Sequence, residues 1–371
     1  MPRLAPAVEE LKTPSVEFVT SVPQDMMNAM YFTSLVIQNE GVEGWPVQLR
    51  KEMAAELLAE LDFLYGYPAG DPGIMGTLGD NLFTHPEAWR DLESLVRYVE
   101  GMPDGIGELD GAPGIQGLIY QTTFRYPDEV DPEVYGQLPH REAIEQRIGS
   151  FDDRDVDAIM PYYDRPAELR ARMVVLIRRF YAEHYEKEMP NRMAALERSV
   201  AVHNAEAMTD AEAVGRMVTG RPKSCLEIGC AGPYERHIFV PSMDMGVYNS
   251  CAIVADVHGM FYPLEPEFMG IQVNVEETRL ARIYKAMADE QRLRILRLLR
   301  GREMYAQEIV EATGIHQSVV SRHLSFMKAV GLVNARRQNN MKFFSVNPGI
   351  RDELAGALDL LAPAAATSRA G

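Results

Sequence analysis

Cysteine is scarce in this sequence: Cys225, Cys230 and Cys251 are the only three among 371 residues. So few thiols cannot form a disulfide framework in a chain of this length, which favours a reducing compartment. Long apolar runs are also missing. No uncharged stretch approaches the roughly 18 apolar residues that a membrane span requires, and the N-terminus MPRLAPAVEELKT lacks the apolar segment of a signal peptide. We therefore expect a cytoplasmic protein with no membrane partner.

Basic residues are outnumbered, with 37 Lys and Arg against 54 Asp and Glu, so the net charge is −17. The imbalance is not uniform. From Glu276 to the C-terminus, 15 basic residues stand against 10 acidic ones, so the rest of the chain carries the whole acidic excess. Such an asymmetry is typical of a nucleic-acid-binding module joined to another domain.

Helical periodicity dominates the N-terminal part of the chain. The stretch 45–66 predicts one long helix, whose apolar face is formed by Leu49, Met53, Leu57, Leu61 and Leu64. Strand-like alternation is limited to residues 15–20 and to short apolar runs between 223 and 262. The fold class we predict is mainly α with minor β. An α-rich domain would span 1–222, and a short strand-rich segment with a linker would span 223–270.

The stretch KSCLEIGCAGPYE (223–235) is similar to the first motif of the S-adenosylmethionine-dependent methyltransferases. A nucleotide-binding turn needs glycines where the backbone approaches the ligand, and a helix must follow it. Here Ala231 and Pro233 occupy the two glycine positions after Gly229, and no helical period follows. We therefore predict a strand and a hairpin turn, with no cofactor. Since no nucleophile–base arrangement stands out either, we expect no enzyme.

A metal site is the other chemistry to consider in this segment, because Cys225, Cys230, His237, Cys251 and His258 offer thiolate and imidazole ligands. On one strand, however, Cys225 and Cys230 would face opposite sides. No C-x-x-C or H-x-x-x-H pair is present to anchor an ion. The spacing predicts ordinary buried cysteines and no metal site.

The C-terminal segment 279–347 alternates helical periods with turn residues. An amphipathic helix is expected over 279–288, and a second one between the N-cap Asp289 and Gly301. A short third helix, a turn at Gly314, a fourth helix and two alternating runs follow. This order is that of a winged helix-turn-helix, whose second motif helix enters the major groove of DNA.

The residues expected to touch DNA lie at the start of that helix and on the wing. Small polar side chains and one arginine can reach bases, wing cations can reach phosphates, and asparagines at the wing tip can reach the minor groove. These candidates are Gln317, Ser318, Ser321, Arg322, Arg336, Arg337, Asn339, Asn340 and Lys342.

The segment closely resembles the ArsR-type winged-helix transcriptional regulators through ARIYKAMADEQRLRILRLL, IHQSVVSRHLSFMKAVGLV and RRQNNMKFFSV. The resemblance implies a DNA-binding domain over 271–361 and a homodimer on a two-fold operator. The low-complexity composition of residues 362–371 predicts a disordered tail. Metal sensing at the family's usual positions is not expected, since EMYAQEIVEATG and IRDELAGALDLL contain neither Cys nor His. The resemblance places the dimer contacts on the first and last helices, at Leu280, Ile283, Tyr284, Met287, Leu354 and Leu358.

Two other functions stay open from the sequence alone. One is an enzyme that holds a nucleoside cofactor near Gly229, which S-adenosylmethionine would stabilise against melting. The other is a protein-interaction module, which would have no affinity for DNA. For the regulator, we expect double-stranded DNA, a second copy of the chain and an unknown small-molecule effector as partners, with the effector acting on the α-rich N-terminal domain.

Overall fold

The protein is seen in a computed structural model that describes residues 14–37, 39–66, 73–108, 112–124, 135, 138–150, 156–220, 225–228, 230, 232–270, 275–338 and 341–358. The predicted wing-tip residues Asn339 and Asn340, the turn residue Gly229 and the tail 362–371 lie outside these ranges. Among the helices described, none is long and apolar enough to cross a membrane.

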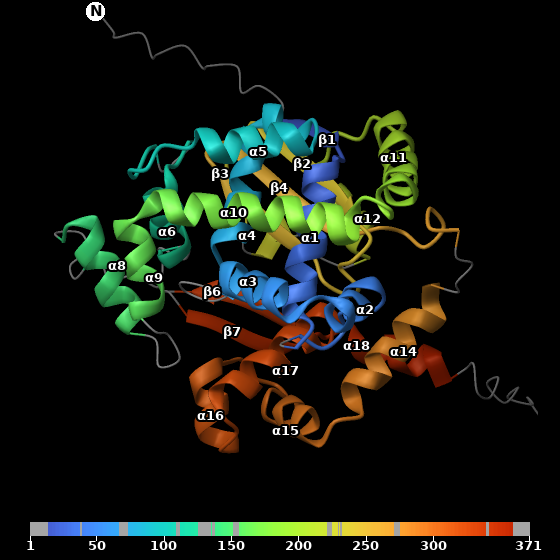
Figure 1. Cartoon of the computed structure of the whole chain (residues 1–371). Coiled ribbons are helices and arrows are strands. Elements are labelled where there is room, and N and C mark those ends of the chain that lie inside the picture. Colours follow the sequence, from blue (N-terminus) through green and yellow to red (C-terminus); the bar gives the residue numbers. More distant parts are fainter. Residues whose placement is uncertain are drawn as a thin grey trace, which may run out of the picture.

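The described residues of the N-terminal part form mostly helices (Figure 1), together with four strands. Its helical elements are α1 (Val22–Leu35), α2 (Trp45–Glu52), α3 (Ala55–Gly66), α4 (Gly73–Asn81), η1 (Leu82–Thr84), η2 (Pro86–Trp89), α5 (Leu92–Gly101), α6 (Ile115–Thr123), α8 (His140–Gly149), α9 (Val156–Asp164), α10 (Pro166–Phe180), η4 (Tyr181–Tyr185), α11 (Met189–Ala205), α12 (Ala211–Thr219) and α13 (Cys225–Ile228). Its strands are β1 (Ser15–Phe18), β2 (Arg236–Ser242), β3 (Ser250–Val254) and β4 (Val257–Pro263).

The four strands form a mixed sheet in the order β1-β2-β4-β3. β1 and β4 both pair with β2 in parallel, and β3 is antiparallel to β4. One face packs against α1 and η1 through Phe32 and Phe83, and the other packs against α12 through Val214. Because β1 belongs to the predicted 1–222 domain and the other strands to the predicted 223–270 segment, the two predicted units share one sheet.

Two local predictions in this part are wrong. The single helix expected over 45–66 is interrupted, because Met53 adopts an extended backbone (ψ 139°) between α2 and α3. Its side chain and the four predicted leucines are buried nonetheless. The second error concerns residues 225–228, which form the short helix α13 instead of the expected strand. The apolar run there does not pair with the sheet but lies beside α12.

A buried ion pair joins the helical layer to the sheet. Arg192 of α11 donates to both carboxylate oxygens of Asp25 on α1, at 2.6 and 2.9 Å, and also binds Asp244, just after β2. The three side chains are at most 5% exposed. Tyr185 donates a further hydrogen bond to Asp25 at 2.6 Å. Burial raises the pKa of Asp244, and the Arg192 guanidinium opposes that rise.

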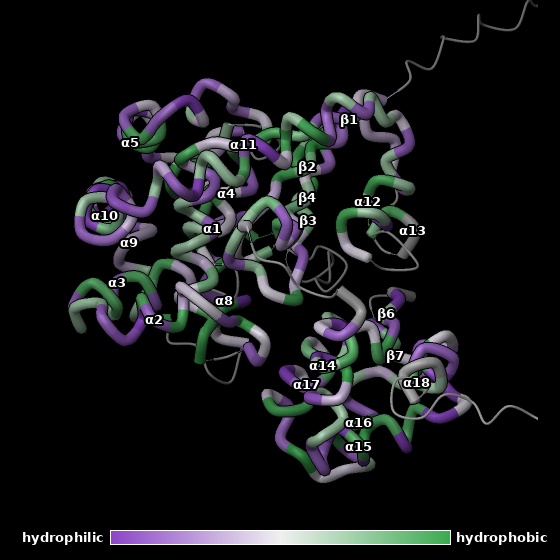
Figure 2. The backbone as a smooth tube through the Cα atoms, turned by 90° about the vertical axis from the view of Figure 1, so that its right-hand side faces the viewer, coloured by the Kyte–Doolittle hydropathy of each residue, from purple (hydrophilic) through white to green (hydrophobic). Residues whose placement is uncertain are grey.

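The C-terminal part has its own apolar core and forms a separate lobe (Figure 2). Its elements are α14 (Val275–Met287), α15 (Glu290–Leu298), β5 (Met304–Tyr305), α16 (Ala306–Thr313), α17 (Gln317–Ala329), β6 (Val333–Gln338), β7 (Met341–Val346) and α18 (Ile350–Leu358). The order helix, helix, turn, helix and hairpin predicted from the sequence is confirmed. Asp289 caps α15 as expected, accepting a hydrogen bond from the Arg292 backbone N–H at 2.9 Å.

Candidate nucleic-acid interface

The helix-turn-helix turn is built from residues that stop one helix and start the next. Gly314 takes a left-handed conformation (φ 66°) that ends α16, a backbone shape that favours glycine. His316 then caps α17, because its Nδ1 accepts from the Ser318 backbone N–H at 3.4 Å. The side chain of Ile315, between them, is buried in the lobe core. The start of α17 is therefore held in place by local interactions.

The predicted DNA-reading residues of α17 lie together on its exposed face. Gln317, Ser318, Ser321 and Arg322 are all exposed, at helical spacing i, i+1, i+4 and i+5. The opposite face buries Val320, Leu324 and Met327 in the lobe core. Hydroxyl, amide and guanidinium groups thus face solvent at the end of the helix that would meet base edges.

The wing places its cations on an antiparallel hairpin. β6 and β7 pair with Arg336 opposite Phe343 and Arg337 opposite Lys342. Arg336 and Lys342 are exposed. Arg336 also forms an exposed ion pair with Glu303, at 2.7 Å between Nε and Oε2, and lies over the Phe343 ring. Exposed ion pairs contribute little to stability, so Arg336 can leave Glu303 and bind another anion with only a small loss of free energy.

His323 lies on the inner face of α17 and supports the helix from behind. Its Nε2 lies 3.0 Å from Gln291 Oε1 and 4.0 Å from Asp289 Oδ1, both at the start of α15. Burial lowers the pKa of His323, although Asp289 partly offsets the effect. The imidazole is thus a packing group between α15 and α17.

The residues expected at a dimer contact divide between surface and core. Ile283 is fully buried inside the lobe, so it does not face outward. Tyr284 is 45% exposed, whereas Leu280, Met287 and Leu354 are half-buried. Leu358 is the last residue of α18. An ion pair between Arg279 and Glu353 joins α14 to α18.

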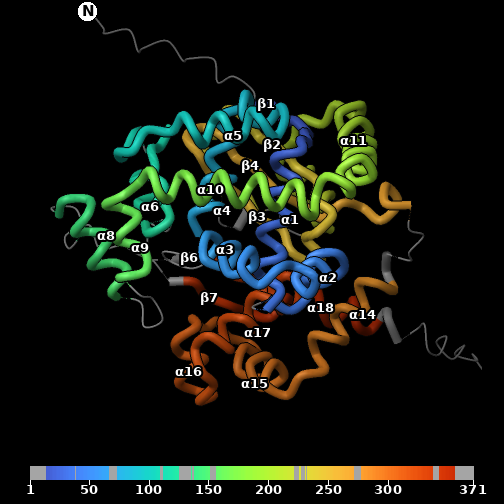
Figure 3. The backbone as a smooth tube through the Cα atoms, viewed as in Figure 1, coloured from blue at the N-terminus to red at the C-terminus, as the bar shows by residue number. Residues whose placement is uncertain are grey.

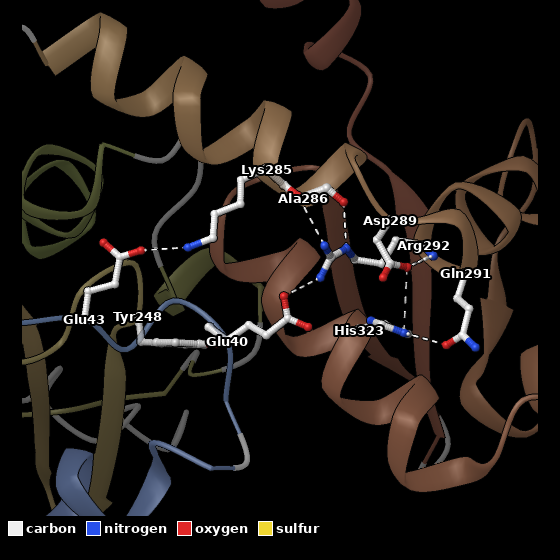
Figure 4. Close-up of polar contacts among 9 residues, drawn as sticks. All are labelled: Glu40, Glu43, Tyr248, Lys285, Ala286, Asp289, Gln291, Arg292 and His323. Carbon is white, nitrogen blue, oxygen red and sulfur yellow. Dashed lines mark hydrogen bonds and ion pairs between the residues drawn. The ribbon is translucent and has the colours of Figure 1, made fainter. Parts of the chain in front are cut away.

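The segment between α1 and α2 touches the winged helix, although the two lie about 250 residues apart in the chain (Figure 3). Glu40 accepts a hydrogen bond from Arg292 Nη1 at 2.6 Å (Figure 4). Arg292 also donates to the Ala286 and Lys285 carbonyls at the end of α14, at 2.7 and 3.1 Å. A second ion pair joins Glu43 to Lys285 at 2.9 Å. The sequence carries no signal for these pairs.

The same segment approaches α17 itself. At Gly41 (φ 90°), an added Cβ would lie 2.9 Å from the Phe326 ring and 2.9 Å from Val247. Phe326 in turn packs under the Arg292 guanidinium, whose Cζ lies 5.1 Å from the ring centroid. The N-terminal part therefore contacts the buried side of α17 and leaves its predicted DNA-facing side chains exposed.

The cysteine segment differs most from what its spacing suggested. Cys225, Cys230, Cys251 and His258 bring their ligand atoms within 4.8 Å of one another. Contrary to the prediction, Cys225 and Cys230 do not lie on opposite sides of one strand, since Cys225 lies in α13 and Cys230 follows this helix. Their mutual hydrogen bond lowers the pKa of the Cys230 thiol and raises that of Cys225 to about 12. The fifth residue considered, His237, contacts His258 from outside the group.

The nucleoside-cofactor alternative gains no support from the described part of this segment. Asp256 follows Gly229 at a sequence distance that would suit a ribose-binding acid, but it lies in the tight turn between β3 and β4. The residues before Gly229 form the helix α13, whereas a nucleotide-binding turn follows a strand of the sheet. The geometry is not that of a nucleotide-binding crossover.

A recognition helix and a wing on a compact helical lobe define the class as a winged helix-turn-helix protein. Residues 289–335 match the model of the bacterial regulatory protein, arsR family. The transcriptional activator HlyU of Vibrio cholerae is 31% identical over 87 residues, which are 22% of this chain and 81% of HlyU. A probable mercury resistance operon repressor of Streptomyces lividans is 40% identical over 73 residues, 19% of this chain and 58% of that repressor.

Among solved structures, the homodimeric winged helix-turn-helix DNA-binding domain Mb0332 of Mycobacterium bovis is 29% identical and covers 25% of this chain and 88% of its own, with a TM-score of 0.21. The structure of HlyU from V. cholerae is 28% identical. The match covers 24% of this chain and 98% of HlyU, with a TM-score of 0.21. The chain belongs to the arsR family of bacterial regulatory proteins. Each of these matches covers a quarter of the chain or less.

Proposed function

We propose that this protein binds a two-fold-related DNA operator as a homodimer and regulates transcription there. The observation that carries the proposal is the exposed polar face of α17 beside a basic wing, in a domain of a family of regulatory proteins. Arg322 is the group on α17 suited to a guanine edge. Arg336 and Lys342 on the wing suit phosphates, which position a protein without reading the sequence.

The homodimer rests on the surface formed by α14 and α18. The Mycobacterium bovis relative is described as homodimeric. In this chain the corresponding proposal pairs the exposed Tyr284 and its half-buried neighbours with the same residues of a second copy. Two recognition helices related by a two-fold axis would reach half-sites about 34 Å apart, one turn of DNA.

Control by the N-terminal part rests on its contact with α14, α15 and α17 through Glu40, Gly41 and Glu43. A signal that changes this contact would change the placement of the recognition helix, and so the affinity for DNA. Both activators and repressors occur among the relatives, so the sign of regulation is left to experiment.

The test compares two arginine variants of the full chain on DNA from upstream of its own gene. Arg322→Ala should weaken binding to the specific site by about 1–3 kcal/mol and leave random DNA unaffected. Arg336→Ala should weaken binding to both DNAs and reduce the salt slope by about 1. The control is Arg97→Ala, which removes an exposed arginine from α5 in the N-terminal part.

Equal binding by all three variants would contradict the DNA-facing surface proposed here. If the wild-type chain binds no DNA even at low salt, the winged helix is instead a protein-interaction surface.

A further inference from the structure

Three cysteines and one histidine from separate segments meet on the sheet face that α12 covers. Cys225 lies in α13, Cys230 follows it, Cys251 lies on β3 and His258 on β4. Their ligand atoms all lie within 4.8 Å of one another, and Cys225 Sγ is 3.2 Å from His258 Nε2. Every cysteine of the chain belongs to this group.

The backbone brings these groups together. Cys251 is opposite Met260 in the β3–β4 pairing and His258 is opposite Ile253, so Cys251 and His258 are diagonal neighbours on one sheet face. The Cys230 backbone N–H donates to the Cys225 carbonyl at 2.9 Å. That bond closes a turn, and the turn directs both thiols toward the sheet.

The ligand set is that of a closed site for a soft cation. Three sulfurs and one imidazole nitrogen match the Cys₃His combination that holds zinc in a tetrahedron. Bonds of about 2.3 Å to sulfur and about 2.0 Å to nitrogen place tetrahedral ligand atoms about 3.5–3.8 Å apart. The four atoms lie within 4.8 Å of one another, and Cys225 Sγ and His258 Nε2 are 3.2 Å apart, so small shifts would bring all of them to these spacings. The group contains no carboxylate, which argues against calcium and magnesium.

His258 is also oriented for this role by a second histidine. Its Nδ1 lies 3.4 Å from His237 Nδ1, so the Nε2 is left facing the thiols. Such an outer hydrogen bond fixes the ring and tautomer of a metal-binding histidine. His258 is fully buried and Tyr234 packs along its ring. His237 also lines a surface pocket together with Leu226, which gives a route from solvent toward the site.

We propose that Cys225, Cys230, Cys251 and His258 bind one soft divalent cation of the zinc class, through three thiolates and the His258 Nε2. Binding releases the thiol protons to solvent and involves no change of oxidation state. α13 has only four residues and lies beside β6 of the wing. If the chain binds DNA as proposed above, the bound ion also regulates that binding. It holds α13 in place beside β6 and thereby changes the affinity of the wing for DNA.

The metal arm of the test uses the full reduced chain and needs no DNA. Titration with Co²⁺ should give one equivalent of a tetrahedral complex, with a sulfur-to-metal charge-transfer band, and Zn²⁺ should displace it. Cys251→Ser should abolish the band. His237→Gln should weaken metal binding by about 10- to 100-fold, as loss of an outer-shell partner does. His140→Gln, at an exposed position on α8, is the control.

A wild-type chain that binds no more Co²⁺ than Cys251→Ser overturns the site. So does a disulfide between these cysteines, found by intact mass in the chain isolated with metal and reductant. Circular dichroism of Cys251→Ser checks that its loss of metal is not a loss of fold.

The DNA arm measures operator Kd with and without Zn²⁺. Zn²⁺ should change the Kd of the wild type by about tenfold and leave that of Cys251→Ser unchanged. One equivalent of metal with an unchanged Kd would overturn the link to the wing while the site stands. Metal binding without any DNA binding would instead count against the proposed function.

Discussion

The contact between Glu40 and Arg292 offers a direct measurement of how firmly the N-terminal part holds the winged helix. Arg292 is 5% exposed and the Glu40 side chain is 50% exposed, so the pair is only half solvated. Truncating Glu40 to Ala removes the carboxylate but keeps its backbone carbonyl, which accepts a hydrogen bond from Tyr248. Arg292→Met keeps most of the buried aliphatic length and removes the charge.

The expected coupling energy lies between two limits. Fully exposed ion pairs contribute about 0.2–1 kcal/mol, and hydrogen bonds to charged groups contribute about 1.5–3 kcal/mol. For a half-solvated pair we expect about 1 kcal/mol of coupling. Arg292→Met alone should cost about 3 kcal/mol, because the Lys285 and Ala286 carbonyls also lose their donor. The double-mutant cycle cancels the free-energy loss from these carbonyls, because Arg292→Met causes it whether or not Glu40 is present.

The assay is urea unfolding of the wild type, both single variants and the double variant, followed by a probe in the winged helix. A second cycle with Glu43→Ala and Lys285→Ala is the matched control, since the Glu43–Lys285 pair is more than half exposed on both sides and should contribute below about 0.5 kcal/mol. A coupling for Glu40–Arg292 no larger than that for Glu43–Lys285 would refute the docked arrangement. The same Glu40→Ala chain should also show an altered operator Kd if the N-terminal part controls DNA binding.

Three further predictions concern stability, pH and assembly. Arg192→Met should destabilise the chain by about 3–5 kcal/mol in urea unfolding, because Asp25 and Asp244 lose a buried partner; a loss below 1 kcal/mol would contradict the network. Because the pKa of His323 is lowered in the fold, the unfolded chain takes up the proton first, so stability falls as the pH drops below about 6.5. His323→Gln should flatten this fall, and an unchanged pH profile would count against the buried imidazole. Tyr284→Glu should weaken self-association in sedimentation equilibrium, and an unchanged dimer would place the contact elsewhere.

The winged helix was predictable from the sequence because its signals are local. Asp289 caps α15 from three residues away, Gly314 ends α16 by its own backbone freedom, and the apolar period of α17 is read within four turns. Each of these features depends on neighbours a few positions apart, so spacing alone is informative. Local spacing gave a wrong prediction at Met53, because the apolar period continues across the break between α2 and α3.

The sequence by itself therefore determined the winged helix, its exposed polar face and its family. It could not place Glu40 beside Arg292, because that pair forms across about 250 residues through packing of two lobes. Nor could it assemble the cysteine group. Cys225 and Cys230 meet Cys251 and His258 only because α13 turns back onto the sheet and strand register places the last two on one face. Ligand geometry of this kind depends on chain reversal and register, which tertiary structure alone decides.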